Sequence, residues 1–150
     1  IDLIGADINL AATRGLAAAM GGHPRYHVFE SLVRQVDAGH LGRKSGHGFI
    51  HPGSPPSTPP DWPAIALRIE ATLANEAAFL ADDSGLPDSD IDTAMKLGLN
   101  FPRGPFEAGG RHGAAAVLSC LSQLEANAPA HLRGRYVPSE ALAPLLAAGA

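Results

Sequence analysis

Hydrophobic residues recur along most of the chain at the spacing of an α-helix. The resulting candidate helices cover residues 7–20, 29–38, 62–81, 87–98, 113–126 and 139–149. In each segment apolar residues lie three or four positions apart, which places them on one face of a helix. Because no segment strongly favours the strict alternation of a half-buried strand, the pattern predicts an all-α fold.

The same spacing predicts which side chains face the core. They are Ile8, Ala12, Leu16, Ala19, Met20, Phe29, Leu32, Val33, Val36, Ile65, Ile69, Leu73, Leu80, Ile91, Met95, Val117, Leu118, Leu121, Leu124, Leu142, Leu145 and Leu146. The composition agrees, since 45% of the residues are hydrophobic but only 5% are aromatic. A core of such small aliphatic side chains favours closely packed helices.

Polar residues and glycines near the helix boundaries predict how the helices begin and end. Asp61 and Ser139 are expected as N-caps, because their side chains can accept a backbone hydrogen bond. Ser89 and Asp92 approximate a capping box. Gly98 is expected to end its helix, since glycine readily adopts the left-handed conformation of a C-cap.

A Pro/Ser-rich stretch, HPGSPPSTPPD, separates two parts of the chain. Such a sequence cannot form a helix or a central strand, and it is typical of a semi-rigid linker. We therefore expect one domain over 1–50, a linker over 51–61 and a second domain over 62–150.

The two parts share an internal repeat in the order glycine, helix, Arg-Tyr, helix, Ala-Gly. The first copy contains Gly5, Arg25, Tyr26, Leu32, Ala38 and Gly39, and the second contains Gly113, Arg135, Tyr136, Leu142, Ala148 and Gly149. The offset of about 110 residues indicates a duplication. Because two helices and a Pro-rich corner precede this element only in the second copy, the chain is expected to hold half of one repeat and one whole repeat.

Charge and cysteine content narrow the class of partner. The formal net charge is −4 and the chain has no basic run, so nucleic acid is not expected as a partner. The single cysteine, Cys120, cannot form an internal disulfide and fits a reducing cytoplasm. No segment approaches the roughly 20 apolar residues of a membrane span. The absence of an initiator Met at Ile1 leads us to expect a fragment of a longer protein.

Several motifs follow one another in order in the second part of the chain: Asn75-Glu76-Ala77, the stretch 90–95, Gly98 and the corner 102–107. Together they resemble the C-terminal domain of L-3-hydroxyacyl-CoA dehydrogenases, a helical fold shared with 6-phosphogluconate dehydrogenase. In the first part the stretches 2–7, 23–26 and 41–49 resemble later segments of the same domain. A tandem pair of such domains resembles the phenylacetate-degradation and multifunctional fatty-acid oxidation branches.

The resemblance implies a parent enzyme that oxidises a 3-hydroxyacyl-CoA to a 3-oxoacyl-CoA with NAD. In that family a Rossmann domain binds NAD, while the helical domain closes the acyl-CoA cleft and builds the dimer. This chain contains no Gly-x-Gly-x-x-Gly cradle. The family's active-site Asn aligns with Leu67, just before Arg68, and Gly110 stands where the first copy has Asp2. The second copy therefore resembles a duplicate that has lost functional residues of the family.

These departures predict that the chain alone is inactive and holds no catalytic, cofactor-binding or metal site. We expect it to support assembly and to form one wall of the acyl-CoA cleft of a homo-oligomeric parent. The first copy is expected to complete the catalytic unit and the second to mimic a dimer partner. The alternative is a non-catalytic α-helical scaffold or oligomerisation module.

The corner after the fourth candidate helix is interpreted as a rigid structural turn rather than a functional site. Gly98 ends the helix, Pro102 and Pro105 fix the exit direction, Gly104 lies between them, and Phe106 anchors the next helix. Leu99 and Phe101 are expected to fold back on the core. A functional alternative is that Lys96, Asn100 and Arg103 grip the phosphates of CoA.

Two further features combine charge with an unusual setting. Arg43 and Lys44 lie in a Gly-rich loop that could attract a substrate phosphate, although the same loop resembles the ordinary closing segment of the family. Glu76 lies beside an apolar stripe, which favours a hydrogen-bonded structural acid over a proton-transfer residue.

The histidines and the cysteine give weaker signals. His27 precedes Val28 and Phe29 in a pattern similar to the surroundings of the family's catalytic His, but the next residues do not match. His40, His47 and His51 lie in a segment whose glycines and proline prevent a stable helix, so solvated side chains are expected rather than metal ligands. Cys120 is expected to be packed rather than reactive.

Overall fold

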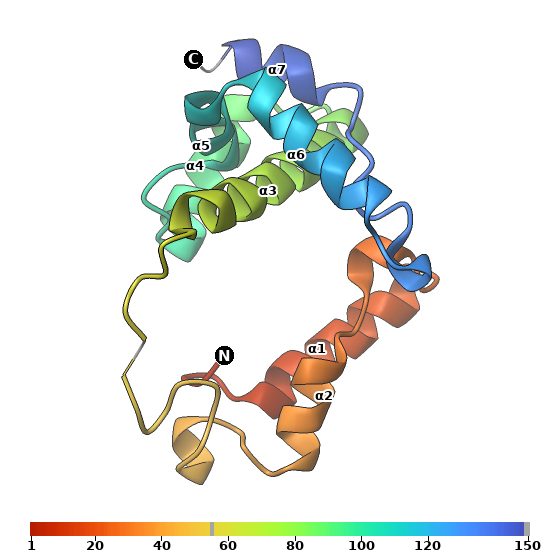
Figure 1. Cartoon of the computed structure of the whole chain (residues 1–150). Helices are drawn as coiled ribbons and strands as arrows, with labels where there is room; N and C mark the ends of the chain where they lie inside the picture. The colour runs from red at the N-terminus through yellow and green to blue at the C-terminus, as the bar shows by residue number, and fades with distance from the viewer. Residues whose placement is uncertain (55, 149–150) are drawn as a thin grey trace. The chain divides into compact units, whose positions relative to one another are not determined.

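The computed structural model describes residues 1–54 and 56–148, and its regular elements are helices (Figure 1). They are α1 (Ala6–Ala19), α2 (Glu30–Asp37), α3 (Trp62–Ser84), α4 (Asp88–Leu99), α5 (Pro105–His112), α6 (Ala114–Ala126) and α7 (Leu142–Ala148), with 3-10 turns at Pro24–Tyr26, Arg43–Ser45 and Ala130–Leu132. Within the described residues the only β pairing is one bridge between Gly42 and His47. The predicted all-α fold is confirmed.

The chain divides into two compact units, Ile1–Thr58 and Pro59–Ala150. The division falls inside the stretch that the sequence marks as a linker, a few residues before α3 begins. In the first unit α1 packs against α2 and against the 3-10 turn that comes after α1. The second unit contains α3 to α7.

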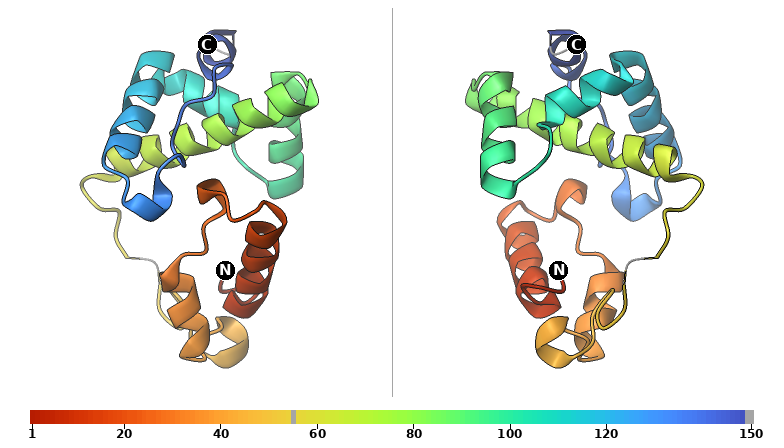
Figure 2. Two further views of the ribbon diagram at one scale, coloured as in Figure 1. Left: turned by 90° about the vertical axis from the view of Figure 1, so that its right-hand side faces the viewer. Right: turned by 90° about the vertical axis from the view of Figure 1, so that its left-hand side faces the viewer.

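The second unit is built around α3, which contacts α4, α5, α6 and α7 (Figure 2). The buried residues of its core are Ala71, Ala74, Ala77, Ala78, Ile91, Phe106, Val117, Leu121, Leu142 and Leu146. All the core residues on α3 are alanines. Their short side chains let the neighbouring helices approach the α3 backbone closely, while the larger Leu and Phe side chains come from the surrounding helices.

The predicted inward face of α1 is wrong, and two of the four residues predicted to face inward from α3 are exposed. On α3, Ile69 and Leu80 are 48% and 49% exposed, whereas the alanines are buried. On α1, Ile8 and Leu16 are about half exposed, and the buried residues are Ala6 and Leu10. The spacing rule favours the largest apolar residues, but the closest helix contacts require the smallest ones.

The predicted helix boundaries need correction as well. Gly98 lies inside α4, and the helix ends at Leu99, followed by the C-cap residue Asn100, whose φ of 55° is left-handed. Asp61 occupies the N-cap position of α3, but its side chain caps no N–H, and α3 continues past the predicted end to Ser84. Ser89 and Asp92 form no capping box, because Asp92 bonds elsewhere. The predicted end of the last helix at Gly149 lies outside the described residues.

The corner after α4 contains a helix that the sequence analysis missed. Residues 105–112 form α5, with Pro105 in its first turn. Two glycines near its end made the segment look like a turn, although proline is favoured at the first position of a helix. Leu99 is 61% exposed and does not fold back on the core.

The C-terminal helices agree with the sequence more closely. Val117, Leu121, Leu142 and Leu146 are almost fully buried, as their spacing predicts. The Ser139 hydroxyl accepts a hydrogen bond from the Ala141 N–H at 3.2 Å, just before α7.

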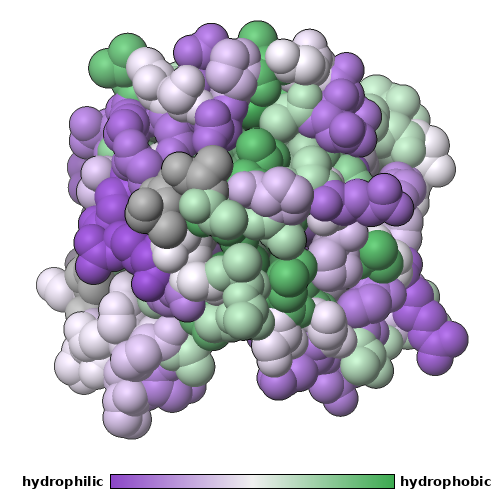
Figure 3. Space-filling view, turned by 90° about the horizontal axis from the view of Figure 1, so that it is seen from above, coloured by the Kyte–Doolittle hydropathy of each residue, from purple (hydrophilic) through white to green (hydrophobic). Residues whose placement is uncertain are grey.

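Apolar side chains also remain on the surface. The space-filling view shows hydrophobic residues gathered in patches among hydrophilic ones (Figure 3). Among the described residues no helix is both long enough and apolar enough to cross a lipid bilayer.

A pair of leucine substitutions tests the core. Leu121→Ala should lower the free energy of unfolding of the second unit by about 2–5 kcal/mol, because a fully buried side chain leaves a cavity. Leu97→Ala is the control, and it should change the stability by less than about 0.5 kcal/mol because Leu97 is 82% exposed. Urea unfolding followed by the fluorescence of Trp62, the only tryptophan, measures both. Equal losses of stability in the two variants would contradict the burial of Leu121 in the core.

Candidate functional site

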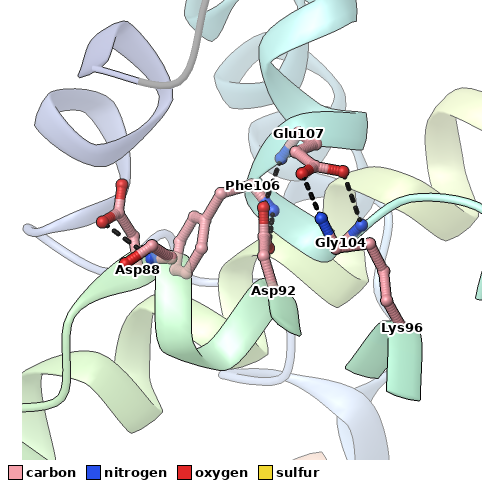
Figure 4. Close-up of polar contacts among 7 residues, drawn as sticks. Asp88, Asp92, Lys96, Gly104, Phe106 and Glu107 are labelled. Atoms are coloured by element: carbon pink, nitrogen blue, oxygen red, sulfur yellow. Dashed lines mark hydrogen bonds and ion pairs between the residues drawn. The ribbon is translucent and has the colours of Figure 1, made fainter. Parts of the chain in front are cut away.

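The Asp92 carboxylate joins α4 to the start of α5. Asp92 is 5% exposed, and its two oxygens accept hydrogen bonds from the Phe106 and Glu107 N–H groups at 2.9 and 3.0 Å (Figure 4). These N–H groups lie in the first turn of α5, where a helix offers no backbone acceptor. A carboxylate at that end also interacts favourably with the helix dipole. Asp92 therefore caps α5 from a different helix.

The corner residues around Asp92 are closely fitted to it. Gly104 precedes α5, and a Cβ atom there would overlap the Asp92 carboxyl group. Pro105 occupies the first turn without an N–H to satisfy, and Phe106 is 1% exposed in the core. Pro102 lies on the exposed side of the same corner. The predicted corner residues thus share one location, while Gly98 lies apart inside α4.

Glu107 forms a second connection between the same helices. One carboxylate oxygen accepts from the Gly104 N–H at 3.1 Å, and the other lies 2.5 Å from the Lys96 Nζ (Figure 4). The Lys96 ammonium and then the Gly104 N–H lower the pKa of Glu107. Lys96 is therefore ion-paired with Glu107, and its alternative role in gripping a CoA phosphate stays a prediction.

Asn75 is a structural residue that the sequence analysis missed. Its Nδ2 donates to the Val137 carbonyl at 2.9 Å, and its Oδ1 accepts from the Ser139 N–H at 2.8 Å. It is 2% exposed, so the pair of bonds holds the segment before α7 against α3. The signal in the sequence is an asparagine in the middle of a long helix, where its propensity is poor.

Glu76 is half-buried beside Asn75. It lines a small cavity of about 130 Å³ together with Arg135 and Tyr136. The Arg135 guanidinium lies over the Tyr136 ring, 5.6 Å from its centroid. Glu76, Arg135 and Tyr136 therefore line the same cavity, between α3 and the segment before α7.

We call a carboxylate that accepts hydrogen bonds from several backbone N–H groups, as Asp92 does, a carboxylate clamp. A second carboxylate clamp lies in the first unit. Asp2 accepts hydrogen bonds from the Phe49, Ile50 and His51 N–H groups at 2.8–2.9 Å. These donors, with the His51 N–H the strongest, lower the pKa of Asp2 from 3.8 to about 2. A Cβ at Gly48 would overlap this carboxylate. Asp2 thus fixes the end of the Gly-rich loop.

The two basic residues of that loop have different surroundings. Lys44 Nζ lies 2.5 Å from Asp7 Oδ1 at the start of α1, and it lowers the pKa of Asp7. The Arg43 side chain is exposed and borders an open hollow of about 570 Å³, which Phe49 and Ile50 also line. Lys44 is therefore engaged within the unit, and Arg43 is the cation that faces the hollow.

Among the residues that the structure describes, the histidines and Cys120 are not part of a metal-binding cluster. The His40 and His47 rings lie 5.5 Å apart, but among the described residues no group of three His, Cys, Asp or Glu side chains could hold a metal ion. The His27 ring packs edge-on against Phe29. Cys120 is half-buried, and burial raises its pKa, so its thiol is not activated.

An open groove of about 520 Å³ runs between the start of α3 and α6. Its lining includes Leu67, Arg68, Cys120 and Leu124. The position that the resemblance aligns with the family's active-site Asn is therefore an apolar leucine at the edge of a mostly apolar groove.

The comparisons with known proteins agree with this helical architecture and its motifs. The family described as "3-hydroxyacyl-CoA dehydrogenase, C-terminal domain" matches residues 65–150, and the chain belongs to that family. The 3-hydroxyadipyl-CoA dehydrogenase of Escherichia coli (strain K12) is 36% identical over 66 residues, which are 43% of this chain and 14% of that protein.

The fold also resembles the crystal structure of 3-hydroxybutyryl-CoA dehydrogenase from Escherichia coli K12. The TM-score is 0.75 at 21% identity, and the match covers 98% of this chain. The likeness of fold therefore extends over both units. This chain covers 50% of that solved chain.

The clamp on α5 can be tested by two substitutions. Asp92→Asn should lower the stability of the second unit by about 2–3 kcal/mol, because an amide cannot accept from both N–H groups and removes the charge. Gly104→Ala should lower the stability by a similar amount, about 1–3 kcal/mol, because the new methyl group displaces Asp92. The control Asp83→Asn, at an exposed position, should stay within about 0.5 kcal/mol. Urea unfolding monitored at Trp62 measures all of them, and a neutral Asp92→Asn would contradict the clamp.

The Asp2 clamp predicts a specific pH dependence. The pKa of Asp2 is lower in the folded chain than in the unfolded one, so the stabilisation is complete above about pH 4 and is lost as the pH falls towards 2. An NMR titration should give a midpoint near pH 2 for the Asp2 carboxyl carbon, and the Phe49 and Ile50 amide protons should shift with it. A midpoint near the ordinary 3.8 would show that the clamp is absent in solution.

Proposed function

We propose that this chain is the C-terminal part of an NAD-dependent 3-hydroxyacyl-CoA dehydrogenase. The observation that carries the proposal is the family match over 65–150 together with a dehydrogenase-like fold over 98% of the chain. The parent reaction is the oxidation of a 3-hydroxyacyl-CoA to a 3-oxoacyl-CoA. NAD and the acid–base pair are held by a different part of the parent.

The role of this chain is to provide shape rather than reactivity. Four carboxylates hold backbone N–H groups or lysines in place, and all of them act within the fold: Asp2, Asp92, Glu107 and Asp7. A group committed in this way is not free to move a proton to or from a substrate. The chain therefore forms one wall of the acyl-CoA cleft and takes part in assembly.

The internal repeat supports a division of labour between the units. Residues 1–50 supply the second half of a first C-terminal domain, which completes the catalytic unit of the parent. Residues 62–150 are a second, complete copy that mimics a dimer partner, since Leu67 and Gly110 replace polar residues of the functional pattern. Arg43 in the first unit attracts a phosphate of the acyl-CoA, with Lys44 contributing to the charge of the loop.

The wider setting of the parent is inferred from its relatives. The tandem arrangement, which resembles the phenylacetate-degradation and fatty-acid β-oxidation branches, supports a role in one of them, and a 3-hydroxyadipyl-CoA dehydrogenase is among the similar proteins. A reducing cytoplasm and a homo-oligomeric parent fit the single half-buried cysteine and the exposed apolar residues. Cleft formation distinguishes this proposal from a purely structural helical scaffold.

A chimera tests the proposal directly. Residues 1–150 replace the matching half of the Escherichia coli 3-hydroxybutyryl-CoA dehydrogenase, and NADH formation from 3-hydroxybutyryl-CoA is measured. We expect turnover by the chimera and none by residues 1–150 alone, which should also fail to bind NAD in calorimetry. NAD binding or turnover by residues 1–150 alone would contradict the proposal. So would a parent coding sequence without a strand and Gly-x-Gly-x-x-Gly upstream of Ile1, which would favour the scaffold.

A further inference from the structure

A second groove of the second unit lies between α3 and the corner that leads into α5. Its volume is about 280 Å³, and most of its lining is apolar: Ile69, Leu73, Phe101, Pro102, Pro105 and Ala108. Part of the α3 face that the spacing predicted for the core therefore lines an open groove. Ligand pockets in proteins usually measure about 300–1,000 Å³, so this groove holds a short chain or a single ring and does not enclose a whole acyl-CoA.

One of the two charged side chains in the lining already has a partner. Glu70 of α3 places its Oε2 atom 2.5 Å from the Nε2 atom of His112, the last residue of α5. Both side chains are partly shielded from water, with 36% of Glu70 and 27% of His112 exposed. The Glu70 carboxylate is thus held at the edge of the groove by a group of the same unit.

The other charged side chain of the lining is Arg103. It is half-buried in the corner and belongs to none of the ion pairs found among the described residues. It interacts electrostatically with Glu107, but the Glu107 oxygens are bonded to the Gly104 N–H and to Lys96. The planar guanidinium of an arginine presents a fork of N–H donors that matches the two oxygens of a carboxylate.

The start of α5, beside the same groove, offers no further donors to an anion. The Gly104 N–H donates to Glu107, and the Phe106 and Glu107 N–H groups donate to Asp92. Pro105 has no N–H at all. An anionic group in this groove would therefore be recognised by the Arg103 side chain and not by the helix N-terminus.

We propose that this groove binds a short apolar chain that ends in a carboxylate, with the chain against Leu73 and Phe101 and the carboxylate on the Arg103 guanidinium. Charge complementarity decides the occupant. An ammonium group would compete with His112 for Glu70 and would leave Arg103 unpaired. A neutral chain would bury apolar surface but would gain nothing from Arg103. A chain of about six carbons matches the size of the groove.

Such a chain has two sources. One is a free carboxylic acid, and the other is the far end of an acyl group that carries a second carboxylate and is attached to CoA. For the CoA-linked source the inference rests on the proposed function, whereas binding of a free acid does not. Because a free acid needs neither NAD nor the rest of the parent enzyme, the groove and the proposed function can fail separately.

An NMR titration of the 150-residue chain with hexanoate tests the groove, and hexanamide is the neutral match. Hexanoate should shift the Leu73, Phe101 and Ala108 amides with a dissociation constant of about a millimolar. Hexanamide should bind about tenfold more weakly, because hydrogen bonds to a charged acceptor are the stronger ones. Arg103→Gln should abolish this difference, while the control Arg133→Gln, at an exposed arginine of the same unit, should retain it. Dispersed amide spectra verify that both variants fold.

Two CoA thioesters distinguish the sources. If adipoyl-CoA shifts the groove amides and hexanoyl-CoA does not, the chain end on CoA is an occupant. If only hexanoate shifts them, the occupant is the free acid. The proposal is overturned if hexanoate and hexanamide bind equally, or if Arg103→Gln keeps the preference for hexanoate. It is also overturned if hexylamine binds more tightly than hexanoate, since Glu70 is then the recognising charge.

Discussion

The second unit depends on one buried carboxylate that satisfies the start of a helix. Two N–H groups in the first turn of α5 donate to Asp92, which lies on α4 and is almost inaccessible to water. Without this acceptor, buried donors would lose their hydrogen bonds to water and gain nothing in return. The bonds therefore fix the direction in which α5 leaves the corner, and with it the position of Phe106 in the core.

The first unit uses the same chemistry on a different segment. Asp2 accepts from three consecutive N–H groups at the end of the Gly-rich loop, and Gly48 leaves the room for it. In both units an aspartate is matched to a glycine that carries no Cβ against it. Carboxylates that a sequence search for acid–base residues would single out thus stabilise turns.

The corner 102–107 shows how far the motifs could be interpreted without coordinates. Its prolines and glycines predicted a rigid change of direction, and the structure places such a turn there. The short helix α5 was missed because Gly109 and Gly110 lower its propensity, although Gly109 is required by the contact with Leu146. The partner of the corner, Asp92, was assigned to a local capping box because its true partners lie fourteen and fifteen positions away.

The sequence by itself determined that the chain is helical, where most of the helices lie, and that its motifs belong to the dehydrogenase C-terminal domain. The helical character and the helix positions arise from local spacing and from turn residues, which act within a few positions of the chain, whereas the family was inferred from a resemblance of ordered motifs. Only the tertiary structure decided which helix faces are buried and which polar groups meet. Ala71 and Ala74 became core while Ile69 stayed exposed, because the contact distance between helices selects small side chains. Asn75 found its partners more than sixty positions away, a pairing that no local pattern contains.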